Sequence, residues 1–216
     1  MKRRTLDVLM SLGGLGLAVL LLIGGLVLTA NANFASTYVS QQLSQQQISF
    51  KTADTLTIEE QQQPCLAAYV GQPLTTGKQA ECYANNFIGV HLQGIAGGKA
   101  YAQLGDVQTQ LQSQIATAQQ TNGPNLADLQ KQLTDATTNR ETVFKGETLR
   151  GLLLTSYGFS EFGSKASQAA IVAYLATGLL LILSIFGLLH AYLTPRTKAF
   201  APPDQVPAVD RPRVNA

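Results

Sequence analysis

Two stretches of this chain, residues 8–30 and 169–193, lack any aspartate, glutamate, lysine or arginine. Each is longer than the ~20 apolar residues needed to cross the ~30 Å hydrocarbon core of a bilayer, so each is predicted to form a membrane-spanning helix. Charged groups inside such helices usually build proton relays and ion pathways. Their absence therefore argues against a self-contained transporter.

Histidine is also scarce, with His91 in the middle of the chain and His190 near the end of the second stretch. A non-haem iron centre commonly needs two histidines and a carboxylate on converging elements. Because a membrane thickness is predicted to separate these two histidines, we expect no such centre. A single histidine could still bind haem, but a lone histidine on a helix with aromatic neighbours is more often packed or hydrogen-bonded.

The chain also lacks the local motifs of common enzymes. It has no Gly-x-Ser-x-Gly elbow, and the glycines and lysine of residues 94–99 do not have the P-loop form. We therefore expect no catalytic residues, no metal site and no cofactor, and we predict that the protein is not an enzyme.

Basic residues flank the outer ends of the two apolar stretches, at positions 2–4 and at Arg196 and Lys198. By the positive-inside bias, both termini are predicted to be cytoplasmic and the middle of the chain extracytoplasmic. We predict a plasma-membrane protein with these segments: a cytoplasmic N-terminus (1–7), transmembrane helix 1 (8–30), a helical extracytoplasmic domain (31–165), transmembrane helix 2 (166–193) and a disordered, Pro-rich cytoplasmic tail (194–216).

A cleaved signal peptide is the alternative for the first stretch, because Ala30-Asn31-Ala32 has the small-x-small form of a cleavage site. A signal peptide has an apolar region of only ~7 to 15 residues. The longer stretch seen here favours a retained anchor.

Charge is nearly balanced in the central segment, where eight basic residues face ten acidic ones. The basic excess of the chain therefore lies in the predicted cytoplasmic ends and is explained by topology. Nucleic-acid binding needs a clustered basic face, so it is not expected. The predicted partners are membrane lipids and other integral membrane protein subunits.

The only cysteines are Cys65 and Cys82, both in the segment predicted to lie outside the cytoplasm. Thiols there are usually oxidised, so a structural disulfide is expected, worth about 3 kcal/mol for so short a loop. A metal site would need more ligands, and a redox pair normally has Cys-x-x-Cys spacing.

Apolar spacing predicts a mainly α fold. Leucine, valine and isoleucine recur every three or four residues from Tyr101 to Ala118 and again from Leu126 to Leu133, which predicts a helical hairpin around the turn at residues 121–125. A third helix is predicted to begin near Lys78, capped by Thr75 or Thr76 and ended by two glycines at 97–98. Alternation within residues 48–58 suggests one or two short strands or an extended crossing.

Residues 149–163 form an apolar cluster interrupted by glycines, which is typical of a segment at a membrane interface. We expect Gly163 or Ser164 to bend the chain before the second span.

Small residues line one face of each predicted span. Such faces let helices approach closely, so they are expected either to pack on each other or to dock on a helix of a larger membrane complex. The faces are Ser11, Gly14, Ala18, Gly25 and Thr29 on the first span, and Ala173, Thr177, Ser184, Gly187 and Ala191 on the second.

Three stretches carry a family resemblance: YVGQPLTTGKQAECYA at 69–84, NFIGVHL with AGGKAY at 86–101, and LRGLLLTSYGF at 149–159. Together they resemble a family of small two-span actinobacterial membrane proteins, often labelled aromatic ring-opening dioxygenases. The resemblance covers most of residues 38–193. It implies a plasma-membrane protein of unknown biochemical role, with no established catalytic residues, and the scarcity of histidine does not fit the dioxygenase label.

The leading functional expectation is a non-enzymatic accessory or scaffolding subunit of a larger membrane complex, with a respiratory-chain complex as one conceivable host. The alternative is an extracytoplasmic ligand-binding or sensing protein. A pocket between helices, lined by Tyr83, Phe87, His91 and Tyr101, would favour the alternative.

Overall fold

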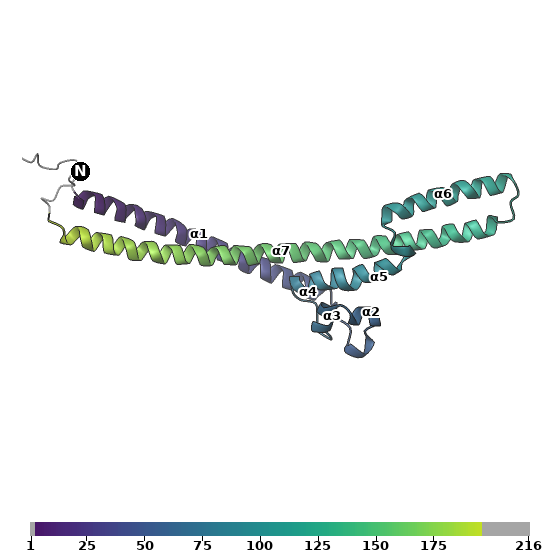
Figure 1. The fold of residues 1–216 in the computed structure, drawn as a ribbon, viewed down its shortest axis with the longest axis horizontal. Coiled ribbons are helices and arrows are strands. Elements are labelled where there is room, and N and C mark those ends of the chain that lie inside the picture. Colours follow the sequence, from purple (N-terminus) through teal and green to yellow (C-terminus); the bar gives the residue numbers. More distant parts are fainter. Residues whose placement is uncertain (1–2, 196–216) are drawn as a thin grey trace, which may run out of the picture. The chain divides into compact units, whose positions relative to one another are not determined.

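The computed structural model describes residues 3–195, and within that range the chain is helical and contains no β-strand (Figure 1). The helices fall into two compact units. One, here the apolar unit, comprises Met1–Ala30 and Ala166–Ala216; the other, here the central unit, is Asn31–Lys165. The predicted disordered tail lies outside the described residues except at positions 194 and 195.

Two long helices contribute to both units: α1 (Arg3–Gln45) and α7 (Leu126–Leu193). Both are long and apolar enough to cross a membrane. A core helix of a soluble protein would be mostly buried, but only 11% and 17% of their most apolar windows are buried. Long apolar side chains therefore point outward along both helices, as a lipid environment requires.

Within the apolar unit, the two small-residue faces meet each other. A Cβ placed on Gly14 would lie 2.5 Å from Ser184 Oγ, and one placed on Gly25 would lie 2.6 Å from Tyr174 Cε1. Thr29 and Tyr174 share a hydrogen bond of 2.9 Å between their hydroxyls. Large residues at either glycine would force the helices apart, so the close approach depends on these glycines.

Other predicted small residues take part in the same contact. Gly187 lies against Ser11, and the Thr177 hydroxyl donates to Ala173 O at 2.8 Å while lying 3.5 Å from Ala18 O. The faces are thus used within the chain.

The central unit has a compact head built from short helices that pack on α1 and α7. They are η1 (Ala53–Thr55), α2 (Ile58–Gln61), α3 (Pro64–Ala68), α4 (Gly77–Cys82), the π-helical turn η2 (Tyr83–Ile88), α5 (Gly89–Gly94) and η3 (Ala96–Gly98). Its core comprises Val39, Leu43, Phe50, Leu66, Leu74, Ala80, Cys82, Ala84, Ile88 and Leu153.

Local sequence explains the start of the predicted third helix. Thr76 accepts a hydrogen bond from the Gln79 backbone and forms a capping box with it, as the sequence predicts. Cys82, at the end of α4, is joined to Cys65 on α3 by a disulfide. The predicted disulfide is therefore present, and it links α3 to α4 within the head.

A helical hairpin, here called the arm, extends from the head as predicted. Helix α6 (Tyr101–Gln120) lies alongside the start of α7 (Figure 1). The arm has its own small core, separate from that of the head, made of Leu111, Ala118, Leu129 and Ala136.

Two expectations need correction. Residues 48–58 form no strand but include an extended crossing, in which a single bridge joins Ser49 to Pro73 and the Phe50 backbone N–H donates to Gln72 O at 2.9 Å. Helix α7 has no bend at Gly163 or Ser164, since it continues to Leu193. The reason is tertiary contact: a Cβ on Gly163 would lie 2.8 Å from Ala35 Cβ, so this glycine lets α1 approach the helix instead of breaking it.

Candidate functional site

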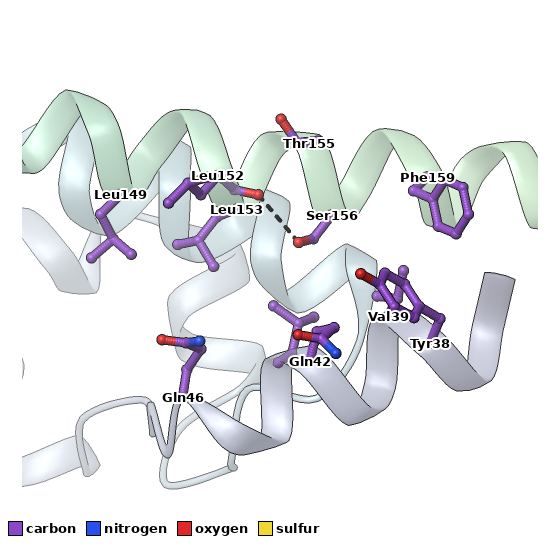
Figure 2. Close-up of a pocket in the computed structure, with 11 residues that line it drawn as sticks. Tyr38, Val39, Gln42, Gln46, Leu149, Leu152, Leu153, Thr155, Ser156 and Phe159 are labelled. Carbon is purple, nitrogen blue, oxygen red and sulfur yellow. Dashed lines mark hydrogen bonds between the residues drawn. The ribbon is translucent and has the colours of Figure 1, made fainter.

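An open groove of about 390 Å³ runs between the end of α1 and the middle of α7 in the central unit (Figure 2). Its floor is apolar, because Val39, Leu43 and Leu153 are buried there. The lining contains no charged residue. It comprises Tyr38, Val39, Gln42, Leu43 and Gln46 from α1, and Leu149, Leu152, Leu153, Thr155, Ser156 and Phe159 from α7.

The two ends of the groove differ. At one end Phe34, Tyr38 and Phe159 form an aromatic cluster, with ring centroids 5.7 to 6.4 Å apart. At the other end Gln42 and Gln46 line the α1 wall (Figure 2). Leu152 on the α7 wall is 62% exposed although it is surrounded by apolar groups. Exposed apolar surface of this kind marks a contact site.

A second feature of the central unit is the fully buried carboxylate of Glu60 on α2. Lys51 Nζ donates to both of its oxygens at 2.7 and 3.0 Å, and the Thr57 backbone N–H donates at 2.7 Å. Burial alone raises the pKa of a carboxyl group, but the hydrogen bonds from Lys51 and Thr57 outweigh it, and the pKa of Glu60 is lowered from 4.5. The side chain is therefore ionised at neutral pH.

His91 on α5 contacts the same carboxylate. Its Nδ1 lies 2.7 Å from Phe87 O, a carbonyl that can only accept, so Nδ1 carries a proton. Its Nε2 lies 3.4 Å from Glu60 Oε1. Both ring nitrogens thus face acceptors.

Aromatic rings connect this ionic cluster to the core. Tyr83, Phe87 and His91 stack in a row with centroids 4.6 and 4.5 Å apart, and Tyr83 also contacts Phe50. The π-helical turn of η2 and the first turns of α5 present these residues, spaced four apart, on one side. Burial, with the nearby Glu60 charge, raises the pKa of Tyr83, which keeps its hydroxyl neutral.

Three of the four residues of the predicted pocket are therefore together, and the fourth is not. Tyr101 begins α6 and instead packs on Phe144 and on the guanidinium of Arg140, 5.5 and 4.3 Å away. The other histidine, His190, lies in the apolar unit with Nε2 3.9 Å from Asp7 Oδ2.

Sequence reasoning missed Lys51 and Glu60. The signal that could have found Glu60 is the capping box, since Thr57 lies three residues before it in the Thr-x-x-Glu pattern. Lys51 has no comparable signal, because only the fold brings it to the carboxylate.

The features described above are suited to binding rather than to catalysis. Among residues 3–195, no three histidine, cysteine or acidic side chains gather as a metal site. The ionic cluster is satisfied internally by Lys51 and His91, whereas the groove remains open. Comparison of the chain with protein-family models, curated proteins and solved structures finds no match.

Proposed function

We propose that this protein is a non-enzymatic accessory or scaffolding subunit of a larger plasma-membrane assembly, in which two spans hold a helical extracytoplasmic domain beside its partner. The resemblance to the two-span actinobacterial family supports the setting. The two long, exposed apolar helices and the disulfide agree with it, since disulfides persist outside the cytoplasm.

The observation that carries the proposal is the low charge of one side of the arm. Helix α6 has 20 residues, of which Asp106 alone is charged, whereas the 20 residues of α7 at 126–145 contain six charges. Most α6 side chains outside its packed stripe are exposed. Because charged residues are depleted from the centres of protein interfaces, the low charge of this exposed face is compatible with contact to a partner.

The small-residue faces do not serve as the docking surface in this proposal. They are occupied within the apolar unit, where Gly14 and Gly187 lie against serines. The spans act as a paired anchor, and the arm makes the contact.

Co-purification in mild detergent tests the proposal. The wild-type protein is expected to bring down a large membrane complex in stoichiometric amounts. Gln112→Glu with Gln119→Glu, which adds two charges to α6, should lower the recovered partner at least several-fold while leaving the arm helical. Gln130→Glu with Gln132→Glu adds the same two charges to the charged helix of the arm and should leave recovery unchanged. Purification of the wild-type protein without any partner would contradict the proposal.

Topology is tested separately with single cysteines at Gln112 and Asp204 in a background lacking Cys65 and Cys82. An impermeant thiol reagent added to intact cells should label the first position and not the second, although Asp204 lies outside the described residues. The opposite pattern would reverse the topology.

A second candidate, an extracytoplasmic ligand-binding protein, is favoured by the groove. Its volume of about 390 Å³ falls within the ~300 to 1,000 Å³ of typical ligand sites, and its lining is apolar with a few polar groups. This role does not compete with the first, because the groove and the exposed face of α6 are different surfaces.

A further inference from the structure

We propose that the groove between α1 and α7 holds one acyl chain of a membrane phospholipid. This inference rests on the ligand-binding role above and names its ligand. The lining selects for hydrocarbon: four leucines, a valine and two aromatic rings face the space, and no charged side chain does. Covering this exposed lining with hydrocarbon removes apolar protein surface from water, which is favourable in proportion to the area covered.

The size of the groove favours a chain over a helix. The groove has a volume of about 390 Å³ and is bounded by two helices, so a partner helix about 10 Å across could insert side chains but not its backbone. Its floor is closed by side chains that α1 and α7 bury against the core, such as Leu43 and Leu153, both at most 3% exposed. A narrow, flexible hydrocarbon chain fits this slot without opening it.

The position of the groove in the chain favours a lipid of the membrane. Tyr38 follows the first apolar stretch by eight residues, and Phe159 precedes Ala166 by seven. At 1.5 Å per residue, the aromatic end is at most about 12 Å of helix from either predicted span. Exposed Phe34, only four residues beyond Ala30, continues the apolar surface toward the groove. Tyrosine and phenylalanine at this depth suit the membrane interface.

The absence of charged residues from the groove lining also favours a phospholipid over a free fatty acid. A fatty acid would bring its carboxylate to the groove, where no lysine or arginine lines the wall to pair with it. A phospholipid can insert an acyl chain while its headgroup stays in the polar layer of the membrane. Glutamine side chains at the far end, Gln42 and Gln46, then limit how far the chain extends (Figure 2).

The test uses the full chain in nanodiscs of phosphatidylglycerol and phosphatidylethanolamine, with a small fraction of lipid carrying a diazirine at the end of one acyl chain. After irradiation, peptide mass spectrometry locates the label. We expect it on residues 38–46 and 149–159, at a yield well above that near Ile58, an exposed apolar residue outside the groove.

Two groove variants sharpen the test. Leu152→Gln should lower labelling about tenfold, the loss expected when one leucine no longer contacts the chain. Gln42→Trp fills the slot from the opposite wall and should do the same. Ile58→Gln is the matched control and should leave groove labelling unchanged. Because Leu152 and Gln42 are exposed, hydrogen exchange of α7 should be unaltered in both groove variants.

Three results would overturn the proposal. Equal labelling of the groove and of Ile58 would show contact without binding. Disulfide cross-links between two chains that each carry Leu152→Cys would make the groove an interface between copies. Labelling only by added diazirine fatty acid would assign a different ligand. The co-purification experiment tests the exposed face of α6, which is a different surface. Failure of the lipid proposal is therefore distinguishable from failure of the proposed subunit role.

Discussion

In the apolar unit, α1 and α7 meet through glycine, alanine and serine, whereas in the arm α6 and α7 meet through leucine and alanine. The difference fits the proposed setting, in which lipid surrounds the first pair of helices and water the second. In water, large apolar side chains gain free energy by leaving the solvent, so a pair of helices is held by residues such as Leu111 and Leu129. In lipid, the surrounding tails are as apolar as leucine, and contact is favoured only where backbones approach closely.

The kind of residue that pairs α7 with its neighbouring helix therefore differs between its two ends. Small residues are essential in one pairing and large residues in the other. A substitution that enlarges a residue should break the first pairing, and one that removes side-chain volume should break the second. The predictions below test this contrast.

The largest effect is expected from Gly14→Leu with Gly25→Leu. Either side chain would collide with the facing helix, since Ser184 Oγ and Tyr174 Cε1 lie 2.5 and 2.6 Å from the Cβ positions. The spans remain apolar, so insertion should persist while their pairing is lost. Lost close packing has no hydrophobic compensation in lipid.

Disulfide cross-linking between Ala18→Cys and Thr177→Cys measures that pairing, because Thr177 Oγ1 lies 3.5 Å from Ala18 O. Its yield should fall several-fold in the double leucine variant. Gly13→Leu with Gly24→Leu is the matched control: nothing lies within 4 Å of either Cβ position, and the yield should be unchanged. Equal yields in both variants would show that the small-residue faces do not hold the spans together.

The complementary change is Leu111→Ala in the arm. Leu111 is 8% exposed within a small separate core, so its truncation should destabilise the arm by about 2 to 5 kcal/mol. Hydrogen exchange of α6 amides in nanodiscs should accelerate accordingly. Gln112→Ala, at the neighbouring exposed position, should change the stability by no more than about 0.5 kcal/mol. Unchanged protection in Leu111→Ala would mean that the arm is held by something other than its apolar stripe.

The sequence predicts this contrast because both patterns are local. Leucines spaced three and four apart predict the arm, and small residues at similar spacing predict close helix contact, either between the spans or with a helix of another protein. The cap at Thr76 is equally local. These features depend on neighbours within a few turns of one helix, so their spacing is visible without the fold.

The Glu60 cluster and the groove depend on tertiary structure and have no periodic signal. Lys51, Glu60 and His91 come from three segments, and the groove needs residues more than 100 positions apart. At Gly163 the local sequence predicted a feature that is absent. This glycine was expected to bend α7 but instead makes room for Ala35. Tyr101 was predicted to join the aromatic residues around His91. It instead begins α6, and the fold of the arm places it against Phe144 and Arg140.

The contrast extends to buried polar groups. In the apolar unit they are hydroxyls bonded to backbone, as at Thr177, whereas the head buries a full charge at Glu60. Glu60→Gln keeps the capping geometry but removes that charge, so it should lower the stability of the head by about 1 to 3 kcal/mol at pH 7.

The pH dependence identifies the cause. Because the folded-state pKa of Glu60 lies below its ordinary value of 4.5, the ionised carboxylate stabilises the fold above pH 4.5. That contribution is lost as the pH falls through the folded pKa, so the wild-type advantage over Glu60→Gln should shrink in acid. Unfolding of both proteins followed at pH 7 and in acid measures it, with Glu141→Gln at an exposed position of α7 as control. An advantage independent of pH would assign the effect to packing.

The smallest expected effect concerns glycines of α7 that make no close contact. Gly151 and Gly158 lie in the helix interior, and nothing is within 4 Å of a Cβ at either position. Alanine there restricts the unfolded chain without a clash, so each substitution should stabilise the central unit by about 0.5 to 1 kcal/mol. Gly163→Ala is the matched comparison, because its Cβ would lie 2.8 Å from Ala35 Cβ, and it should destabilise. Hydrogen exchange along α7 distinguishes the signs. Stabilisation by Gly163→Ala would mean that α1 and α7 do not require the close approach on which the groove wall depends.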